Sequence, residues 1–441
     1  MSDTIYWIWL ANALGAGSRY LPYILERYSS PYELFRADSE EIERLELTPR
    51  IIKALLDKDM SEAYEINDHC ASHNIGIITY AGKYYPERLR MLKDPPAVLY
   101  FKGTFPQIND TLSLGVVGTR KMTEYGKRSA YKIAYELAAA GVTVVSGMAL
   151  GIDAVSSVGA ICGGGKTIAV LGSGVDVVYP PEHTTLYNKI IEHGAVISEY
   201  PPTSRPIGSH FPVRNRIISG MTNGTLVIEG DNGSGSLITA KRALEQGRDI
   251  FALPGNIESK TAIGTNQLIH DGATMVIRTE DILNQYEFYY GKTFDYIGLE
   301  LAKTKSDLKD EILSEMGVFR KGRAIKEKNE DVEVDPLNIL RPRKKPKKKS
   351  FDSVSTGKKE EPSSEKKNTK EMQRDPRLEA IMSELSEEET AVLKNMPDDR
   401  AVNVDYLIKF GLAASTIMGT LAILEIKGLV SSLPGGLYIK N

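Results

Sequence analysis

The order of apolar and polar residues divides the chain into four parts. In residues 5–28 apolar side chains recur at helical spacing, and a second helical pattern opens at Ser39 with a capping-box sequence. These patterns predict a helical domain over residues 1–78. The Gly-rich turn at residues 14–17 is typical of a helix-hairpin-helix (SAM-like) variant, in which loop amides contact a DNA phosphate, and equally of an ordinary turn in a helical bundle.

From residue 112 to residue 277 the pattern changes to apolar, β-rich runs separated by helical stretches. The runs are LSLGVVG, VTVVSG, TIAVLGSG, AVISEY, TLVIEG, DIFALPG and TMVIR. They are continuously apolar, as strands are in a parallel sheet that is covered on both faces. The pattern predicts an α/β domain, Rossmann-like and doubly wound with a mostly parallel sheet, over residues 79–298 including a lead-in segment.

The remaining sequence is divided by a charged stretch. Residues 299–375 lose the pattern, and within them residues 341–370 are rich in lysine and hold one aromatic residue, so they predict a charged disordered linker. Both a solvated tether and a weak DNA-binding arm fit this composition. Residues 376–441 predict three helices and a β-hairpin, which is the plan of a winged-helix module.

Composition narrows the function further. The 441 residues carry a net charge of -3, so a nucleic-acid surface has to be local. Cys70 and Cys162 are the only cysteines, which excludes a disulfide framework and a cysteine-based zinc site and suggests a reducing compartment. The apolar N-terminal run is broken by Asn12 and has no basic start, so we expect no signal peptide, no membrane span and a cytoplasmic protein.

Glycine-rich loops follow four of the predicted strands. They lie at residues 116–120, 145–153, 171–176 and 228–239. The carboxyl ends of parallel strands meet at one edge of a sheet, and glycine lets backbone amides approach an anion there, aided by the dipole of the next helix. Together the loops predict an anion-binding edge.

Two common cofactor signatures do not fit this edge. The GGGKT of residues 163–167 precedes a strand, whereas a phosphate-binding P-loop follows one. The first loop, GVVGTR, lacks the G-x-G-x-x-G spacing, and the second strand ends in VVSG without an acidic residue to hold a ribose. A nicotinamide or flavin enzyme is therefore disfavoured, and we expect no cofactor and no metal.

Arginines supply the charge that such an edge needs. Arg120 ends the first loop, and FPVRNRIISG places Arg214 and Arg216 just after Phe211. A forked guanidinium matches phosphate geometry, and an aromatic ring beside a cationic groove is what base stacking uses.

The successive motifs resemble those of the DNA-processing protein A (DprA, also called Smf) family, in the same order. The segments are VVGTRKMTEYG, SGMALGIDAVSSVGA, TIAVLGSGVDVVYPPEH, ISEYPP, FPVRNRIISG, GSGSLITAKRALEQGRDIFALPG and GTNQLIHDGA. YPERLRMLKDPPAVLYFKG resembles the lead-in, and the C-terminal module resembles the winged-helix tail of many members.

The resemblance implies a non-enzymatic protein that binds and protects single-stranded DNA, forms a homodimer and helps load the RecA recombinase in natural transformation. The implied DNA-binding residues are Gly118, Thr119, Arg120, Gly172, Ser173, Gly174, Phe211, Arg214, Asn215, Arg216, Gly233, Ser234, Gly235 and Ser236. Asn266 and Met275 are implied at the dimer surface. Pro181 departs from the family, since some members have a basic residue there; Lys189 or His183 could replace that contact, although His183 is expected to be an ordinary surface residue.

Two other functions fit parts of the pattern. Rossmann-like phosphoribohydrolases carry a Glu just beyond a comparable glycine loop, but here Glu229 and Asp231 precede GSGSLITA and no carboxylate follows. A transcriptional regulator would combine a nucleotide sensor with the winged helix. The predicted recognition helix, residues 413–428, has Lys427 as its only basic residue, which is poor for reading a DNA groove.

Overall fold

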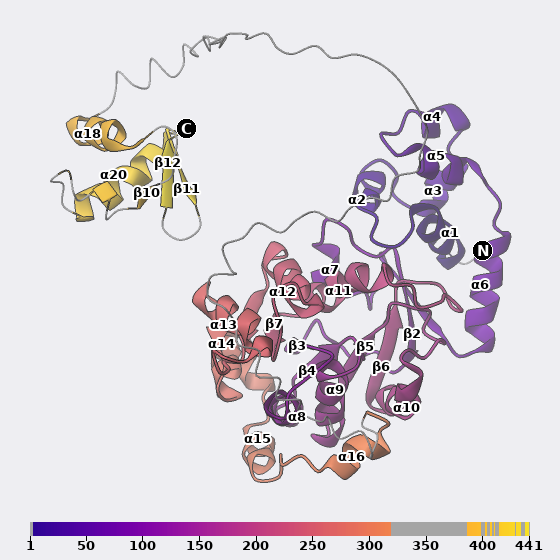
Figure 1. Cartoon of the computed structure of the whole chain (residues 1–441). Helices are drawn as coiled ribbons and strands as arrows, with labels where there is room; N and C mark the ends of the chain where they lie inside the picture. The colour runs from indigo at the N-terminus through magenta and orange to yellow at the C-terminus, as the bar shows by residue number, and fades with distance from the viewer. Residues whose placement is uncertain are drawn as a thin grey trace, which may run out of the picture. The chain divides into compact units, whose positions relative to one another are not determined.

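The computed structural model describes residues 3–318 and, with short gaps, residues 386–440 (Figure 1). The chain divides into two compact units, residues 1–326 and residues 327–441. Among the described residues, no helix is both long enough and apolar enough to cross a membrane.

A nine-stranded sheet forms the centre of the first unit, in the order β1-β2-β6-β5-β4-β3-β7-β8-β9. The strands are β1 (Gly76–Thr79), β2 (Val98–Gly103), β3 (Ser113–Val117), β4 (Thr143–Ser146), β5 (Thr167–Val170), β6 (Gly194–Ser198), β7 (Gly224–Val227), β8 (Asp249–Ala252) and β9 (Thr274–Met275). The strands from β3 to β9 are parallel and correspond to the seven predicted runs, so the Rossmann-like prediction is confirmed. The antiparallel strands β1 and β2 were not predicted from the sequence.

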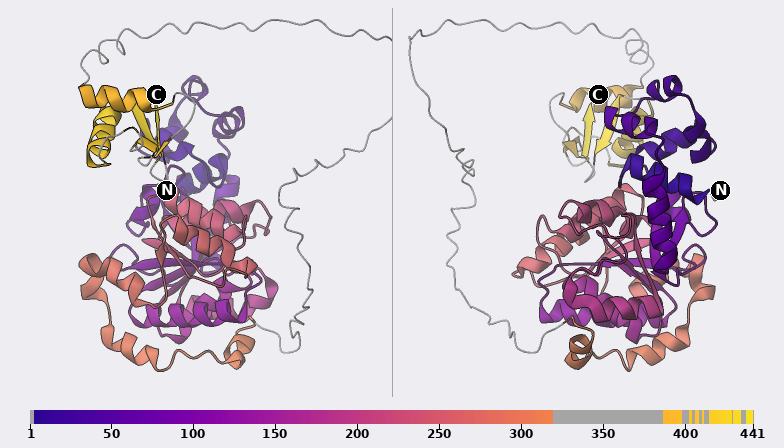
Figure 2. Two further views of the ribbon diagram at one scale, coloured as in Figure 1. Left: turned by 60° about the vertical axis from the view of Figure 1, so that its left-hand side comes forward. Right: turned by 90° about the vertical axis from the view of Figure 1, so that its right-hand side faces the viewer.

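Helices cover both faces of this sheet, as the two views of Figure 2 show. One face packs against α8 (Glu124–Ala139), α9 (Ile152–Cys162), α10 (Thr184–His193) and α14 (Glu280–Tyr290), and the other packs against α7 (Glu87–Arg90), α11 (His210–Gly220) and α12 (Gly235–Glu245). Short helical segments η1 (Pro181–His183), η2 (Lys260–Ala262), α13 (Ile263–His270) and η3 (Gly291–Thr293) complete the domain. The residues of β3 to β7 are buried on both sides, which explains their predominantly apolar sequences.

The N-terminal segment is helical, as predicted. It contains α1 (Thr4–Leu14), α2 (Tyr20–Leu25), α3 (Pro31–Arg36), α4 (Ser39–Glu43), α5 (Pro49–Leu56) and α6 (Ser61–Ser72). Its core includes Trp7, Ile8 and Leu10 and continues into Val98 and Tyr100 of β2, so this segment packs directly on the sheet. The proposed domain boundary at residue 78 falls within β1.

The predicted linker begins too early. Residues 299–318 contain most of α15 (Tyr296–Lys303) and all of α16 (Asp310–Glu315), and both helices pack on the first unit. Leu299 and Leu313 are buried in the core beneath α8, and the ammonium of Lys127 on α8 lies 2.8 Å from an Asp310 carboxylate oxygen. The remainder of the proposed linker, residues 319–375, lies outside the described residues.

The second unit is small. It contains α18 (Glu387–Asn395), α20 (Ala414–Ile426) and a three-stranded antiparallel sheet in the order β10-β12-β11, formed by β10 (Val402–Asn403), β11 (Val430–Leu433) and β12 (Leu437–Lys440). A complete capping box at Ser386 and Glu389 starts α18, and β11 with β12 forms the predicted hairpin. The ammonium of Lys427 lies 2.8 Å from a Glu389 carboxylate oxygen, so the charge of Lys427 is part of an ion pair.

Candidate nucleic-acid interface

A pocket of about 640 Å³ lies at the carboxyl ends of the parallel strands. It is lined by the loop after β3 and by the first turns of α11 and α12. The strand order runs outward from β3 in both directions, to β4 on one side and β7 on the other. Ligands of open α/β sheets bind at such a reversal of strand order, so the pocket occupies the position that the topology favours.

The loop after β3 brings two cations to the rim. A Cβ atom on Gly118 would lie 2.6 Å from the Ile152 side chain, so glycine allows the close packing of this loop on α9. The Thr119 amide donates to the Glu229 carbonyl at 2.8 Å, and the Thr119 hydroxyl accepts from the Lys121 amide at 3.2 Å. These bonds fix the loop, while the side chains of Arg120 and Lys121 are exposed at the pocket.

Phe211 presents an aromatic surface between cations. Its ring centroid lies 5.5 Å from that of Tyr179, and the guanidinium carbons of Arg120 and Arg214 lie 5.8 and 5.9 Å from it. Gly172 packs behind the ring, because a Cβ there would approach it to 3.0 Å. The ring is partly exposed, so its position is set by neighbours while a face remains available for stacking.

Arg214 forms part of the pocket wall from a buried position. Only 3 % of the residue is exposed, and its Nη1 donates to the carbonyl oxygens of Val170 and, at 2.9 Å, Gly147. Burial lowers the pKa of Arg214 to about 10, while the nearby Asp153 carboxylate opposes this change. Arg214 is therefore charged at neutral pH, and its hydrogen bonds hold together the ends of β4 and β5.

The amino end of α12 completes the pocket. Gly233 has a φ of +80° in the preceding turn, and the hydroxyls of Ser234 and Ser236 lie 2.9 Å apart. In the described part of the chain, the Ser234 side chain makes no capping hydrogen bond to this helix. The first-turn amides of α12 and its dipole are thus available to an anion.

The structure brings most of the predicted DNA-binding residues together. Nine of them line the pocket: Gly118, Thr119, Arg120, Phe211, Arg214, Asn215, Ser234, Gly235 and Ser236. Residues 172–174 are buried behind Phe211, where the Ser173 hydroxyl donates to the Val177 carbonyl at 3.0 Å. Gly233 is exposed in the turn but lies outside the lining of the pocket.

Arg216 does not point into the pocket. It is 2 % exposed, its Nη2 donates to both Glu199 carboxylate oxygens at 2.6 Å, and its Nε lies 3.5 Å from an Asp94 oxygen. Glu199 also accepts the Gly17 amide at 3.1 Å. The geometry thus assigns Arg216 to the junction with the N-terminal helices rather than to a phosphate.

Other predicted positions also differ from expectation. His183 is buried rather than at the surface, with its Nδ1 3.1 Å from the Met148 carbonyl oxygen. Lys189 pairs with Glu192 at 2.7 Å, and neither Lys189 nor His183 is in the lining of the pocket. Asn266 forms two hydrogen bonds to the backbone of Gly255, at 3.0 and 3.1 Å, whereas Met275 is 49 % exposed.

Several residues that line the pocket were not predicted, and three of them carry a charge or an aromatic ring. Lys121 follows Arg120 directly, so the local charge could have indicated it. Asp153 lies in a predicted glycine loop, where its carboxylate accepts the amides of Gly118, Gly147 and Ala149, and burial raises its pKa. Tyr179 reaches Phe211 from a separate loop, and its sequence gives no signal of that contact.

Comparison with known proteins assigns the family. Residues 76–287 match the family described as DNA recombination-mediator protein A, and residues 376–436 match the DprA winged helix domain. The DNA processing protein DprA of Bacillus subtilis is 42 % identical over 211 residues, which cover 48 % of this chain and 71 % of that protein. The protein Smf of Synechocystis sp. is 34 % identical over 291 residues, which cover 64 % of this chain and 72 % of that protein.

A solved structure agrees with these sequence matches. The X-ray structure of DprA from Streptococcus pneumoniae is similar with a TM-score of 0.57 and 32 % identity, covering 66 % of this chain and all of that one. The C-terminal match also confirms the predicted winged helix. The chain therefore belongs to the DNA processing protein A family, whose members are named DprA or Smf.

Proposed function

We propose that this protein binds single-stranded DNA in the pocket at the ends of β3 and β7. The observation that carries the proposal is the arrangement of Arg120, Lys121 and the amino end of α12 around the partly exposed ring of Phe211. The cations and amides suit successive phosphates, and the ring suits the face of a base. Neither kind of contact reads base edges, so the binding is expected to tolerate any sequence.

The family assignment supports a wider role for this binding. A recombination mediator in the cytoplasm would hold and protect incoming strands and help load RecA on them during natural transformation. No catalytic step is proposed. Glu229, one of the two carboxylates that precede the glycine loop of α12, is buried and accepts hydrogen bonds from the Thr123 amide, the Thr123 hydroxyl and the Thr261 hydroxyl. Its bonding is structural, which disfavours the phosphoribohydrolase alternative.

Arg120→Ala tests the pocket directly. Loss of one phosphate contact should weaken binding to single-stranded oligonucleotides of any sequence and reduce the slope of log K against log salt by about 0.7. Arg242→Ala is the matched control, because Arg242 also lies near the binding domain's surface but pairs with Glu245 at the far end of α12. Fluorescence anisotropy over a salt series measures both effects. An unchanged slope in Arg120→Ala, or an equal loss in the control, would reject the site.

We further propose that two copies associate near β9. Met275 is exposed there together with Ile263 and Ile277, which are 40 % and 68 % exposed. Asn266 is no longer proposed as a contact, since its amide is bonded to Gly255. A dimer would join two DNA pockets and raise avidity for long strands by roughly a hundredfold.

Met275→Arg tests the dimer. It should yield a monomer by light scattering and lose affinity for long strands more than for strands that fill one pocket. Met275→Leu, which keeps the apolar surface, is the control. A dimeric Met275→Arg protein, or a monomer with undiminished affinity for long strands, would contradict the proposal.

A further inference from the structure

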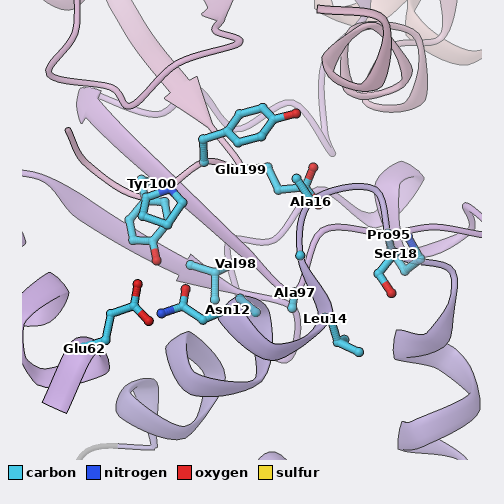
Figure 3. Close-up of a pocket in the computed structure, with 14 residues that line it drawn as sticks. Asn12, Leu14, Ala16, Ser18, Glu62, Pro95, Ala97, Val98, Tyr100 and Glu199 are labelled. Carbon is cyan, nitrogen blue, oxygen red and sulfur yellow. The ribbon is translucent and has the colours of Figure 1, made fainter. Parts of the chain in front are cut away.

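A second cavity, of about 240 Å³, shares no lining residue with the DNA pocket (Figure 3). It is bounded by the carboxyl end of α1, the start of α6, the strand β2 with the residues before it, and the residues after β6. The N-terminal helices and the sheet therefore build it jointly. Its volume is several times that of a water molecule, so it has room for a small organic group.

One end of this cavity is polar and incompletely bonded. Tyr100 is 1 % exposed, and within the described part of the chain its hydroxyl has no hydrogen-bond partner. Figure 3 shows that hydroxyl, the carboxylate of Glu62 and the side-chain amide of Asn12 pointing toward one another. A buried hydroxyl without a partner costs free energy, so the site is suited to a group that bonds to it.

The charge of the lining selects the kind of group. Among the described residues that line the cavity there are two carboxylates, Glu62 and Glu199, and no lysine, arginine or histidine. Glu199 is already paired with Arg216, whereas the exposed Glu62 carboxylate forms no ion pair with any of the described residues. The α1 helix also ends here at Leu14, with its negative dipole end, although Arg50 bonds to the Leu14 carbonyl at 2.9 Å. This lining disfavours a phosphate or carboxylate ligand and favours a cation.

We propose that this cavity binds a primary alkylammonium group. An ammonium has three N–H donors and no acceptor, which matches three groups with acceptor oxygens, the Tyr100 hydroxyl, the Glu62 carboxylate and the Asn12 amide. The alkyl stem would lie along the aliphatic side of the cavity, formed by Val98 and Ala97. A guanidinium is a poorer match, because its planar fork needs acceptors in one plane.

Binding here would act on the junction of the N-terminal helices with the sheet. Glu62 belongs to α6, Asn12 to α1 and Tyr100 to β2, so one ammonium would connect three elements. The cavity also includes Glu199, which holds Gly17 and Arg216. Because the DNA pocket is lined by other residues, the amine and an oligonucleotide should bind the same molecule without competing.

The test uses the full-length protein with putrescine, measured by isothermal titration calorimetry at pH 7.5, where the amine is protonated. We expect saturable binding to one site per chain and a rise in melting temperature. Glu62→Gln, which removes the charge that attracts the ammonium, and Tyr100→Phe, which removes a hydrogen bond to it, should each weaken binding by about tenfold or more. The matched control is Glu65→Gln, an exposed carboxylate on α6 that is outside the cavity lining. 1,4-Butanediol, the neutral analogue, should not bind.

The melting temperature of Tyr100→Phe gives a second test, which does not depend on the affinity for the amine. The variant retains the buried ring and removes the unpartnered hydroxyl, so without ligand it should keep or raise the melting temperature. Nα-acetyl-lysine amide separates the two sources of the ammonium: binding equal to that of putrescine would indicate a lysine side chain of a polypeptide, and weaker binding a free small amine. Absence of putrescine binding, or equal binding by the wild type, Glu62→Gln and Tyr100→Phe, would overturn the proposal.

Discussion

Replacing Arg216 with methionine separates the two roles that this arginine could have. In the structure its guanidinium is buried and bonded to Glu199, which in turn holds the Gly17 amide. Removing one partner of a buried ion pair leaves the other charge uncompensated and typically costs about 3–5 kcal/mol. Arg216→Met should therefore lower the free energy of unfolding by about that amount while leaving the salt dependence of DNA binding unchanged.

The size of the loss should depend on pH. Burial already raises the pKa of Glu199, and Arg216 is the main influence that opposes this rise. Without Arg216 the pKa of the folded carboxyl rises further above its unfolded value, so the folded state binds the extra proton as the pH falls. The stability that Arg216→Met loses should thus be partly recovered as the pH falls from neutral toward the ordinary pKa of a glutamate. The double variant Arg216→Met with Glu199→Gln should recover more of it at neutral pH, because no buried charge remains.

The assay can follow the relevant region directly. The only two tryptophans, Trp7 and Trp9, are both buried in the N-terminal helices that Arg216 contacts through Glu199 and Gly17. Urea unfolding monitored by tryptophan fluorescence reports on that region, and anisotropy with a single-stranded oligonucleotide in the absence of urea reports on DNA binding. Unchanged stability together with a reduced salt slope would refute the reasoning and return Arg216 to the phosphate site.

Two further predictions concern the ordered C-terminal edge of the first unit and its buried histidine. A chain ending at residue 318 should fold and keep its affinity for single-stranded DNA within a few-fold. A chain ending at residue 298 should lose about 3–6 kcal/mol of stability, because the buried side chains of Leu299 and Leu313 are removed. Urea unfolding of the two truncated chains measures the difference, and equal stability would contradict the prediction. Burial lowers the pKa of His183, so the unfolded state takes up a proton below about pH 6.5 that the folded state resists, and stability should fall as the pH drops through that range. His183→Gln should show a smaller fall between pH 7 and pH 5.5 in the same assay, and a pH dependence identical to that of the wild type would exclude His183 as its source.

The strands of the sheet could be predicted because their burial is visible in local sequence. The parallel strands β3 to β7 are buried on both faces, so their sequences are predominantly apolar runs. β2 (Val98–Gly103) lacks that signal at its end, where Lys102 and Gly103 are partly or fully exposed, and its pairing with β6 is set by tertiary contacts. The helices α15 and α16 were missed for a related reason. They have few apolar residues among many charged ones, and these few are enough to hold the helices in place because they pack into the core beneath α8.

The sequence could predict which loops meet at the site, because those loops follow the carboxyl ends of strands. Topology brings the loop after β3 and the first turn of α12 to one edge, so Arg120 and Ser234 could be grouped from sequence. Burial of a particular arginine could not be predicted in that way. Arg214 and Arg216 are the same residue type, two positions apart in one motif, so the sequence does not distinguish them. The groups around each guanidinium do: carbonyl oxygens bind Arg214, and the Glu199 carboxylate binds Arg216.

Helical geometry explains why neighbouring residues of FPVRNRIISG have separate roles. Successive residues of α11 are turned by about 100°, so Phe211, Arg214 and Asn215 share one side of the helix while Val213 and Arg216 share the opposite side. The first side lines the DNA pocket, and the second contacts Gly17 and Glu199. Because one rigid helix carries both sets, the contacts made by Arg216 fix the rotation of α11 and thereby the direction in which Phe211 faces. Arg216 can thus influence the DNA site without touching the DNA.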